Sequence, residues 1–224
     1  MKKIIKLITT KFPKSEKYLL NDTDRAELIL KLGLGVNAVY AIFKLSSGIF
    51  YRSFWFGAVG VYYILLCSLK FYLLHKGFPA ECISRRGQLV TLRNCSVLLL
   101  FLNLTMSVII FYLIKQNKGF SYSDFVLLAS ALYTVFRLVA AFSDIVSFKR
   151  MHIPVLAAAK SVSMSVALMS LFSLQVTLLD RIKAEAILKT ALNILSGTLI
   201  ILAVISIAVT SIVKAEREIR KKGS

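Results

Sequence analysis

Six apolar segments follow one another along the chain, each 20 to 27 residues long and each able to cross a bilayer as a helix. In lipid the backbone polar groups have no water to bond, so only helices and closed barrels can span a membrane. The pattern predicts an all-α, polytopic transmembrane helix bundle of about six spans within residues 28–213. We place the spans at Leu28–Phe50, Phe54–Leu74, Cys95–Ile114, Phe125–Val146, Val155–Leu179 and Ile187–Val213.

The connections between these segments are short. Only Tyr51–Ser53 separates the first two spans, which predicts a tight antiparallel hairpin. The stretch His75–Asn94 contains four basic residues together with Pro79 and Gly87, and we interpret it as a polar connecting loop with at most a short surface helix. This organisation leaves no room for a separate soluble catalytic domain.

Basic residues outnumber acidic ones, with 29 Lys and Arg against 11 Asp and Glu. A surplus of this size is typical of nucleic-acid-binding proteins. Here, however, the basic residues stand at the ends of apolar runs and are not interleaved with aromatic residues that could stack on bases. We therefore expect no nucleic-acid partner.

The distribution of the basic residues predicts the orientation of the bundle. If the N-terminus is cytoplasmic, 20 Lys and Arg residues lie on the inner side, five on the outer side and four within the apolar segments. The inner count includes the five residues from Lys70 to Arg93, of which Lys70 falls near the end of the second span. Because membrane proteins keep positive charge on the cytoplasmic side, we predict a multi-pass cell-membrane protein with both termini in the cytoplasm.

Two basic tails flank the membrane domain, at residues 1–27 and 214–224. Over residues 1–12, apolar side chains fall on one side of a helix and lysines on the other. Such a helix is typical of an anchor that lies on an anionic leaflet. We expect anionic lipids at the cytoplasmic face to be partners of these tails.

An internal similarity links the first and fourth spans. Ala38–Leu45 matches Ala131–Leu138 with residue type conserved at nearly every position, at an offset of 93 residues. Each copy precedes a short basic connection and an apolar helix rich in small residues. Since the first span runs outward and the fourth inward, the pattern indicates two inverted three-helix repeats, an arrangement common in secondary transporters.

The repeat pairs Lys44 with Arg137 and Tyr40 with Tyr133, and each tyrosine precedes its cation by about one helical turn. A charge halfway along a span is costly unless it faces protein or water. The two cations therefore either line a cavity that attracts an anionic group or bond carbonyls of neighbouring helices and fix the packing. All four residues are candidates for a solute pathway or for packing.

The fifth span carries Ser161 and Ser165 on a face of small residues. Such a face lets a partner helix approach closely. We interpret the two serines as packing residues, with a serine-lined pathway as the alternative.

The sequence contains no pattern that indicates an enzyme or a metal centre. It has no Walker loop, GxSxG elbow, HExxH pair or paired catalytic carboxylates, so we expect no enzymatic activity and no cofactor. His75 and His152 stand close to basic residues and lack acidic or Cys neighbours at ligand spacing, which argues against a metal site. No carboxylate occupies a span centre, so the usual apparatus for proton or cation coupling is not expected.

The spacing of these features resembles the membrane part of the cation diffusion facilitators, a family with six spans and cytoplasmic termini. The likeness rests on Asn37–Gly48, on Arg52 and Ser53, and on Pro154–Ser165, and it covers most of residues 33–210. It implies a helix arrangement. The chain is equally similar to six-span bacterial membrane proteins without an assigned activity.

The chain departs from that family at the positions that would bind metal. The family places His or Asp four residues from Asp on spans two and five, to hold zinc or a similar ion. The matching positions here are Tyr62, Leu66, Ser161 and Ser165, which do not make a divalent-metal cage. The family's cytoplasmic C-terminal domain also has no counterpart, since the sequence given ends about ten residues after span six. The resemblance therefore implies no metal ligand.

Three functions follow as hypotheses. The first is a dimeric transporter-like membrane protein that carries an anionic or non-metal solute past Lys44 and Arg137. The second is a non-transporting scaffold or accessory subunit that has lost its transport ligands. The third, a metal exporter in the strict family sense, predicts saturable binding of zinc or manganese.

Overall fold

The computed structural model describes residues 22–78, 83–116, 123–148, 153–182 and 185–221. The first of these segments contains two long helices and each of the others contains one, and no strand occurs in them. The helices are α3 (Asp22–Phe50), α4 (Phe54–Gly77), α5 (Arg85–Gln116), α6 (Asp124–Phe148), α7 (Pro154–Arg181) and α8 (Ala186–Lys221). All six are long and apolar enough to cross a membrane, which makes the chain a multi-pass integral membrane protein with an all-α fold, as predicted.

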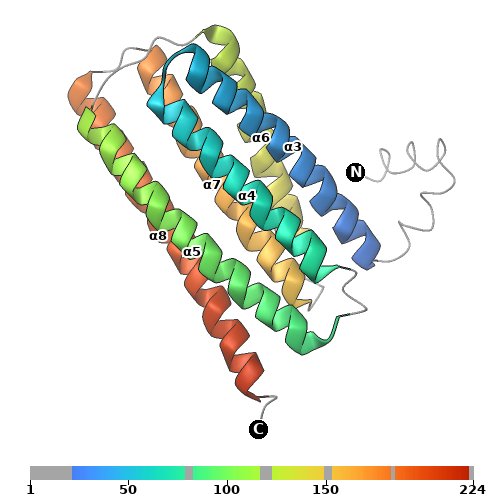
Figure 1. Cartoon of the computed structure of the whole chain (residues 1–224). Helices are drawn as coiled ribbons and strands as arrows, with labels where there is room; N and C mark the ends of the chain where they lie inside the picture. The colour runs from blue at the N-terminus through green and yellow to red at the C-terminus, as the bar shows by residue number, and fades with distance from the viewer. Residues whose placement is uncertain (1–21, 79–82, 117–122, 149–152, 183–184, 222–224) are drawn as a thin grey trace, which may run out of the picture.

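The six helices form one bundle in which successive helices run in opposite directions (Figure 1). α3 packs against α4, α6 against α7, and α5 against α8. α7 lies at the centre, since it also contacts α4, α5 and α8, and most of its membrane segment is buried inside the protein. The pairs α3–α4 and α6–α7 correspond to each other in the predicted repeat.

The α3–α4 hairpin is as tight as its three-residue connection predicts. A Cβ atom on Gly48 would lie 2.6 Å from the backbone nitrogen of Gly57, so the two backbones touch. In the turn, Arg52 has a φ of 49°, and the amide of Ser53 donates to the carbonyl of Gly48 at 2.9 Å. This is a Schellman-type helix end with arginine at the left-handed position that glycine usually fills.

Three predictions about the connections and tails need correction or completion. The stretch His75–Asn94 is not mainly a loop, because α5 already begins at Arg85. Lys70, which was counted among the charges of the inner side, lies inside α4 and is buried. The basic segment from residue 214 continues α8 as helix through Lys221. The amphipathic tail predicted over residues 1–12 lies outside the described residues, as does His152.

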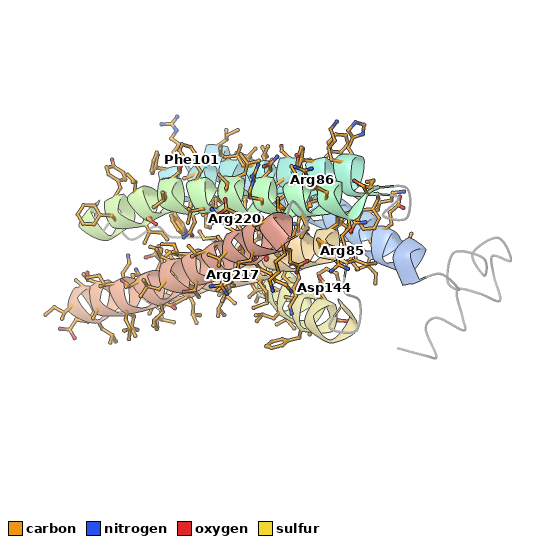
Figure 2. All side chains as sticks on the ribbon, turned by 90° about the horizontal axis from the view of Figure 1, so that it is seen from below. Arg85, Arg86, Phe101, Asp144, Arg217 and Arg220 are labelled. Carbon is orange, nitrogen blue, oxygen red and sulfur yellow. The ribbon has the colours of Figure 1, made fainter. Side chains whose placement is uncertain are left out.

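The two ends of the bundle differ in character. The end at which α3 begins and α8 finishes, here called the basic end, carries Arg85 and Arg86 of α5 near Arg217 and Arg220 of α8, together with Asp144 of α6 (Figure 2). Arg85 forms an ion pair there with Glu218, at 3.3 Å.

At the opposite end, here called the hairpin end, ion pairs join the helix termini. Arg181 of α7 lies 2.7 Å from Asp124 of α6, and Lys189 of α8 pairs with Asp180 of α7. Lys189, one of the four basic residues predicted inside an apolar segment, is therefore neutralised at the end of the bundle. Both ends of the described chain lie at the basic end (Figure 1).

Candidate functional site

The repeat-related tyrosines meet face to face in the middle of the bundle. The rings of Tyr40 on α3 and Tyr133 on α6 are stacked, with centroids 3.4 Å apart and planes 5° from parallel. Tyr63 of α4 places its ring edge-on against both, at 5.1 and 5.8 Å. Because α3 and α6 run in opposite directions, the two cations that follow these tyrosines lie on opposite sides of the stack.

On the side toward the hairpin end, Lys44 is completely enclosed. Its ammonium group donates to the hydroxyl of Ser130 at 3.0 Å. The same group lies 4.2 Å from the centroid of the Phe56 ring, within range of a cation–π interaction. The charge is therefore held by one hydroxyl and by an aromatic ring.

On the side toward the basic end, Arg137 is equally buried but differently bonded. It is 2% exposed, yet its Nε and Nη2 atoms have no hydrogen-bond partner among the described residues. These two donors form one edge of the planar guanidinium group, the edge that binds a carboxylate through two parallel hydrogen bonds. A buried donor pair without a partner is costly, so this edge is prepared for an acceptor.

A second cation approaches Arg137 from α4. With the Asn37 amide oriented to satisfy all its neighbours, its oxygen accepts from Lys70 Nζ at 3.2 Å and its nitrogen donates to the Tyr133 hydroxyl at 3.1 Å. A Cβ atom on Gly33 would lie 3.5 Å from Lys70 Nζ and 3.8 Å from Arg137 Nη1. The absence of a side chain at Gly33 therefore leaves both cations accessible from one small space.

That space is a cavity of about 180 Å³ between α3, α4, α6 and α7. Its polar lining consists of Lys70, Arg137, Asp144 and Ser163, and the rest of the wall is apolar or glycine. Asp144 forms no ion pair within 4.0 Å among the described residues, so it does not occupy either cation directly. Two cations and one carboxylate leave one formal positive charge, which suits a bound monoanion.

The two candidate serines of α7 lie outside this cavity. Ser161 donates to the carbonyl of Ala157 at 3.1 Å and contacts the Ser211 hydroxyl of α8 at 3.3 Å. Ser165 donates to the carbonyl of Ser161 at 3.0 Å. Both hydroxyls thus bond their own helix, and the α7 serine that lines the cavity is Ser163.

The four positions that the sequence resemblance aligned with metal ligands, Tyr62, Leu66, Ser161 and Ser165, are buried side chains. Tyr62 and Leu66, both on α4, are buried in the interior of the bundle. Across the part of the chain that the structure describes, no group of three or more His, Cys, Asp or Glu side chains gathers in a way that could hold a metal ion. His75 stacks on Phe71 at 6.4 Å.

Comparison with known proteins adds no family to this geometry. No protein-family model matches the chain, and no curated protein matches it significantly. The functional argument therefore rests on the site itself.

Sequence reasoning singled out Arg137 and both tyrosines but missed two polar residues that line the cavity, Lys70 and Asp144, and also Asn37, which bonds Lys70. A signal existed for Lys70, because it follows Tyr63 by seven residues and therefore lies on the same buried face of α4. Asn37 corresponds to Ser130 in the repeat, at the same offset of 93 residues. Ser130 bonds Lys44 and Asn37 bonds Lys70, so each of the two equivalent positions supplies a hydrogen-bond partner for a buried lysine.

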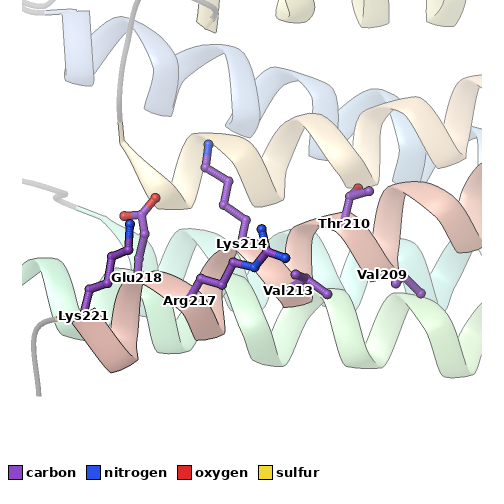
Figure 3. A pocket seen from close by; sticks show the side chains of 7 residues that line it. All are labelled: Val209, Thr210, Val213, Lys214, Arg217, Glu218 and Lys221. Carbon is purple, nitrogen blue, oxygen red and sulfur yellow. The ribbon is translucent and has the colours of Figure 1, made fainter.

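A second hollow, of about 440 Å³, runs along the outer surface of α8 near the basic end (Figure 3). Val209 and Val213 line its apolar part, and Lys214, Arg217 and Lys221 line the part closer to the helix end. All of its lining residues belong to this one helix, so it is an open surface groove and not an internal site.

Proposed function

We propose that the protein is a membrane transporter for a small anionic solute, which binds at Arg137 and Lys70 in the cavity between α3, α4, α6 and α7. The observation that carries this proposal is the unpartnered guanidinium edge of a fully buried arginine beside a cavity. Intramembrane ionisable residues are expensive to bury and commonly mark a substrate pathway. Of the two candidate cations, Arg137 therefore serves binding, and Lys44 serves the architecture on the far side of the tyrosine stack.

The proposed pathway continues past the stack of Tyr40 and Tyr133. The stack separates the cavity from Lys44 and Ser130, so the state described here is closed toward the hairpin end. A second state, open toward the hairpin end, would release the anion on that side. Inverted repeats support exchange between two such states by movement of one half against the other.

We place the basic end in the cytoplasm, on the basis of the excess of Lys and Arg residues there. The cavity would then lie on the cytoplasmic side of the barrier. The groove on α8 would face the inner leaflet, with Lys214, Arg217 and Lys221 at the depth of anionic lipid headgroups. The resemblance to cation diffusion facilitators extends, in this proposal, to the helix arrangement and not to the transported ion.

A thermal-shift experiment on the purified protein tests the binding step. Small carboxylates, halides, nitrate and phosphate are titrated, since a ligand that binds only the folded state raises its stability. We expect a saturable shift with at least one anion. Arg137→Gln or Lys70→Gln should weaken that binding by about tenfold or more, because each removes a charged hydrogen-bond donor. Lys31→Gln is the matched control, since Lys31 is an exposed lysine paired with Glu27.

Anion flux into proteoliposomes tests transport itself. Flux that saturates and disappears in Arg137→Gln supports the transporter. Binding without flux would instead favour the non-transporting scaffold, and the absence of any anion-dependent shift in a folded protein would overturn the proposed site. Saturable zinc or manganese binding would instead support the hypothesis of a metal exporter.

A further inference from the structure

The described residues do not enclose the cavity at Arg137 on all sides. Leu32 of α3 and Phe136 of α6 line it, yet they are 63% and 49% exposed on the surface of the bundle. In a membrane this surface faces acyl chains. The apolar wall of the cavity is therefore continuous with the lipid-facing surface of α3 and α6.

The arrangement of the helices explains this lateral opening. Along its described length α3 packs closely against α4, whereas its backbone contacts with the other helices are few. Side chains bridge α3 and α6 at the tyrosine stack, but toward the basic end Gly33 contributes none. Among the described residues, the two helices thus leave a gap beside Lys70 and Arg137 that opens on the exposed apolar surface of α3 and α6.

From this geometry we infer that the solute is an amphiphile with a carboxylate headgroup. The headgroup bonds Arg137 and Lys70, and its hydrocarbon tail passes between Leu32 and Phe136 into the lipid. This inference rests on the proposed function, because it uses the same cationic site and specifies the class of its solute.

The size and charge of the cavity support a carboxylate amphiphile over a larger lipid. A volume of about 180 Å³ is below the range of roughly 300–1,000 Å³ found for sites that enclose a whole drug-sized ligand, so it holds a headgroup and not a tail. The two donors on one edge of Arg137 match the two oxygens of one carboxylate. A monoanion also balances the one formal positive charge of the lining.

Entry from the membrane also resolves how a polar group reaches a buried cation. A carboxylate that approaches along α3 and α6 with its tail in lipid exposes no hydrocarbon to water on the way. The transfer of each buried methylene from water to an apolar environment is favourable by about 0.8 kcal/mol. An amphiphile should therefore concentrate in the bilayer beside this site and occupy it at a lower total concentration than its short-chain analogue.

Photo-crosslinking in nanodiscs of phosphatidylcholine tests the inference. The probe is dodecanoate with a diazirine on its tail, and dodecanoate, dodecanol and acetate serve as competitors. We expect labelling at α3 and α6 near Leu32 and Phe136, displaced by dodecanoate at a concentration at least about tenfold below that of acetate. Dodecanol, which lacks the charge, should displace poorly.

Two variants separate the headgroup from the tail. Arg137→Gln should lower the labelling of α3 and α6 by about tenfold. Leu32→Trp should narrow the lateral gap and weaken dodecanoate by a larger factor than acetate, with both carboxylates measured on the same variant. Val39→Trp is the matched control, since Val39 is an exposed apolar residue of α3 outside the cavity lining.

The outcomes distinguish this inference from the proposed function. Labelling spread evenly over the lipid-facing helices, or displacement by dodecanol as effective as by dodecanoate, overturns the amphiphile. If acetate binds at Arg137 as tightly as dodecanoate, the small-anion transporter stands and the amphiphile fails. If neither carboxylate depends on Arg137, both are wrong.

Discussion

The two sides of the central tyrosine stack hold their cations in different surroundings. Lys44, toward the hairpin end, is fully buried and is held by Ser130 and Phe56. Arg137, toward the basic end, has two donors without a partner among the described residues, beside a cavity. Both side chains are almost wholly buried, so burial alone does not distinguish the two surroundings.

A pair of glycines on α3 shows what creates the difference. At Gly48 the α3 and α4 backbones touch, and no space remains. At Gly33 the nearest atoms beyond the helix are the charged ends of two long side chains. One glycine closes the hairpin end, and the other leaves the cavity at the basic end open.

The largest effect is expected from Gly48→Ala. Its new Cβ atom would lie 2.6 Å from the backbone of Gly57, which cannot move without separating α3 from α4. We expect a loss of about 2–3 kcal/mol of stability, measured by unfolding in detergent. Gly33→Ala and Gly35→Ala are controls that should change stability by less than about 1 kcal/mol. Equal losses at all three glycines would contradict the contrast between the two ends.

Exchange of each cation for methionine should separate binding from packing. Arg137→Met should weaken anion binding by about tenfold or more, whereas Lys44→Met should change it less than about threefold. Because an apolar residue of similar size often replaces a buried charge without loss, Lys44→Met should also keep or raise the melting temperature. Isothermal titration and thermal unfolding measure the two quantities. Loss of binding only in Lys44→Met would reverse the assignment of the two sides.

A smaller effect is expected for Tyr133→Phe. This change keeps the ring stack with Tyr40 but removes the hydrogen bond to Asn37, which holds the amide that bonds Lys70. We expect a loss of about 1 kcal/mol in stability, together with weaker anion binding. In an Asn37→Ala background, Tyr133→Phe should lower stability only a little further, because both changes remove the same hydrogen bond. Full additivity in this double-mutant cycle would count against the coupling.

The smallest effect concerns the turn at the hairpin end. Arg52 has a left-handed backbone conformation, which glycine adopts without steric cost. Arg52→Gly should therefore be more stable than Arg52→Ala by about 1 kcal/mol. Both variants remove the charge, but only glycine lacks the Cβ atom that is crowded in a left-handed conformation. Melting temperatures of the two variants in the same detergent provide the comparison. Equal values would show that the turn carries no such strain.

Most of the fold could be predicted from the sequence, because each span is a continuous apolar run and the bilayer sets its length. The start of α5 could not, since Arg85–Asn94 mixes three arginines with Leu89, Val90 and Leu92 and so lies outside the continuous apolar run, although it is part of the same helix. Helix hydrogen bonds extend past the apolar region as readily as within it. The ends of helices are therefore less visible in a membrane protein than their centres.

The candidate site was predictable in part, through the repeat. The match between two spans identified Arg137 and the paired tyrosines, but it assigned Lys44 the same role. It could not show that Lys70 turns inward, because a lysine seven residues before a helix end could equally extend to the interface. The spacing between α3 and α6 decides which of the cations faces a cavity. That spacing is a tertiary distance, and no local sequence pattern predicts it.

The close contact of Gly48 with Gly57 has a consequence for biosynthesis. α3 and α4 are joined by three residues and touch along their backbones, so they can enter the bilayer as a preformed helical hairpin. Lys44 must then be accommodated before Ser130, its hydrogen-bond partner 86 residues later, has been synthesised. During that interval the ring of Phe56, supplied by the same hairpin, can shield the ammonium group until α6 arrives.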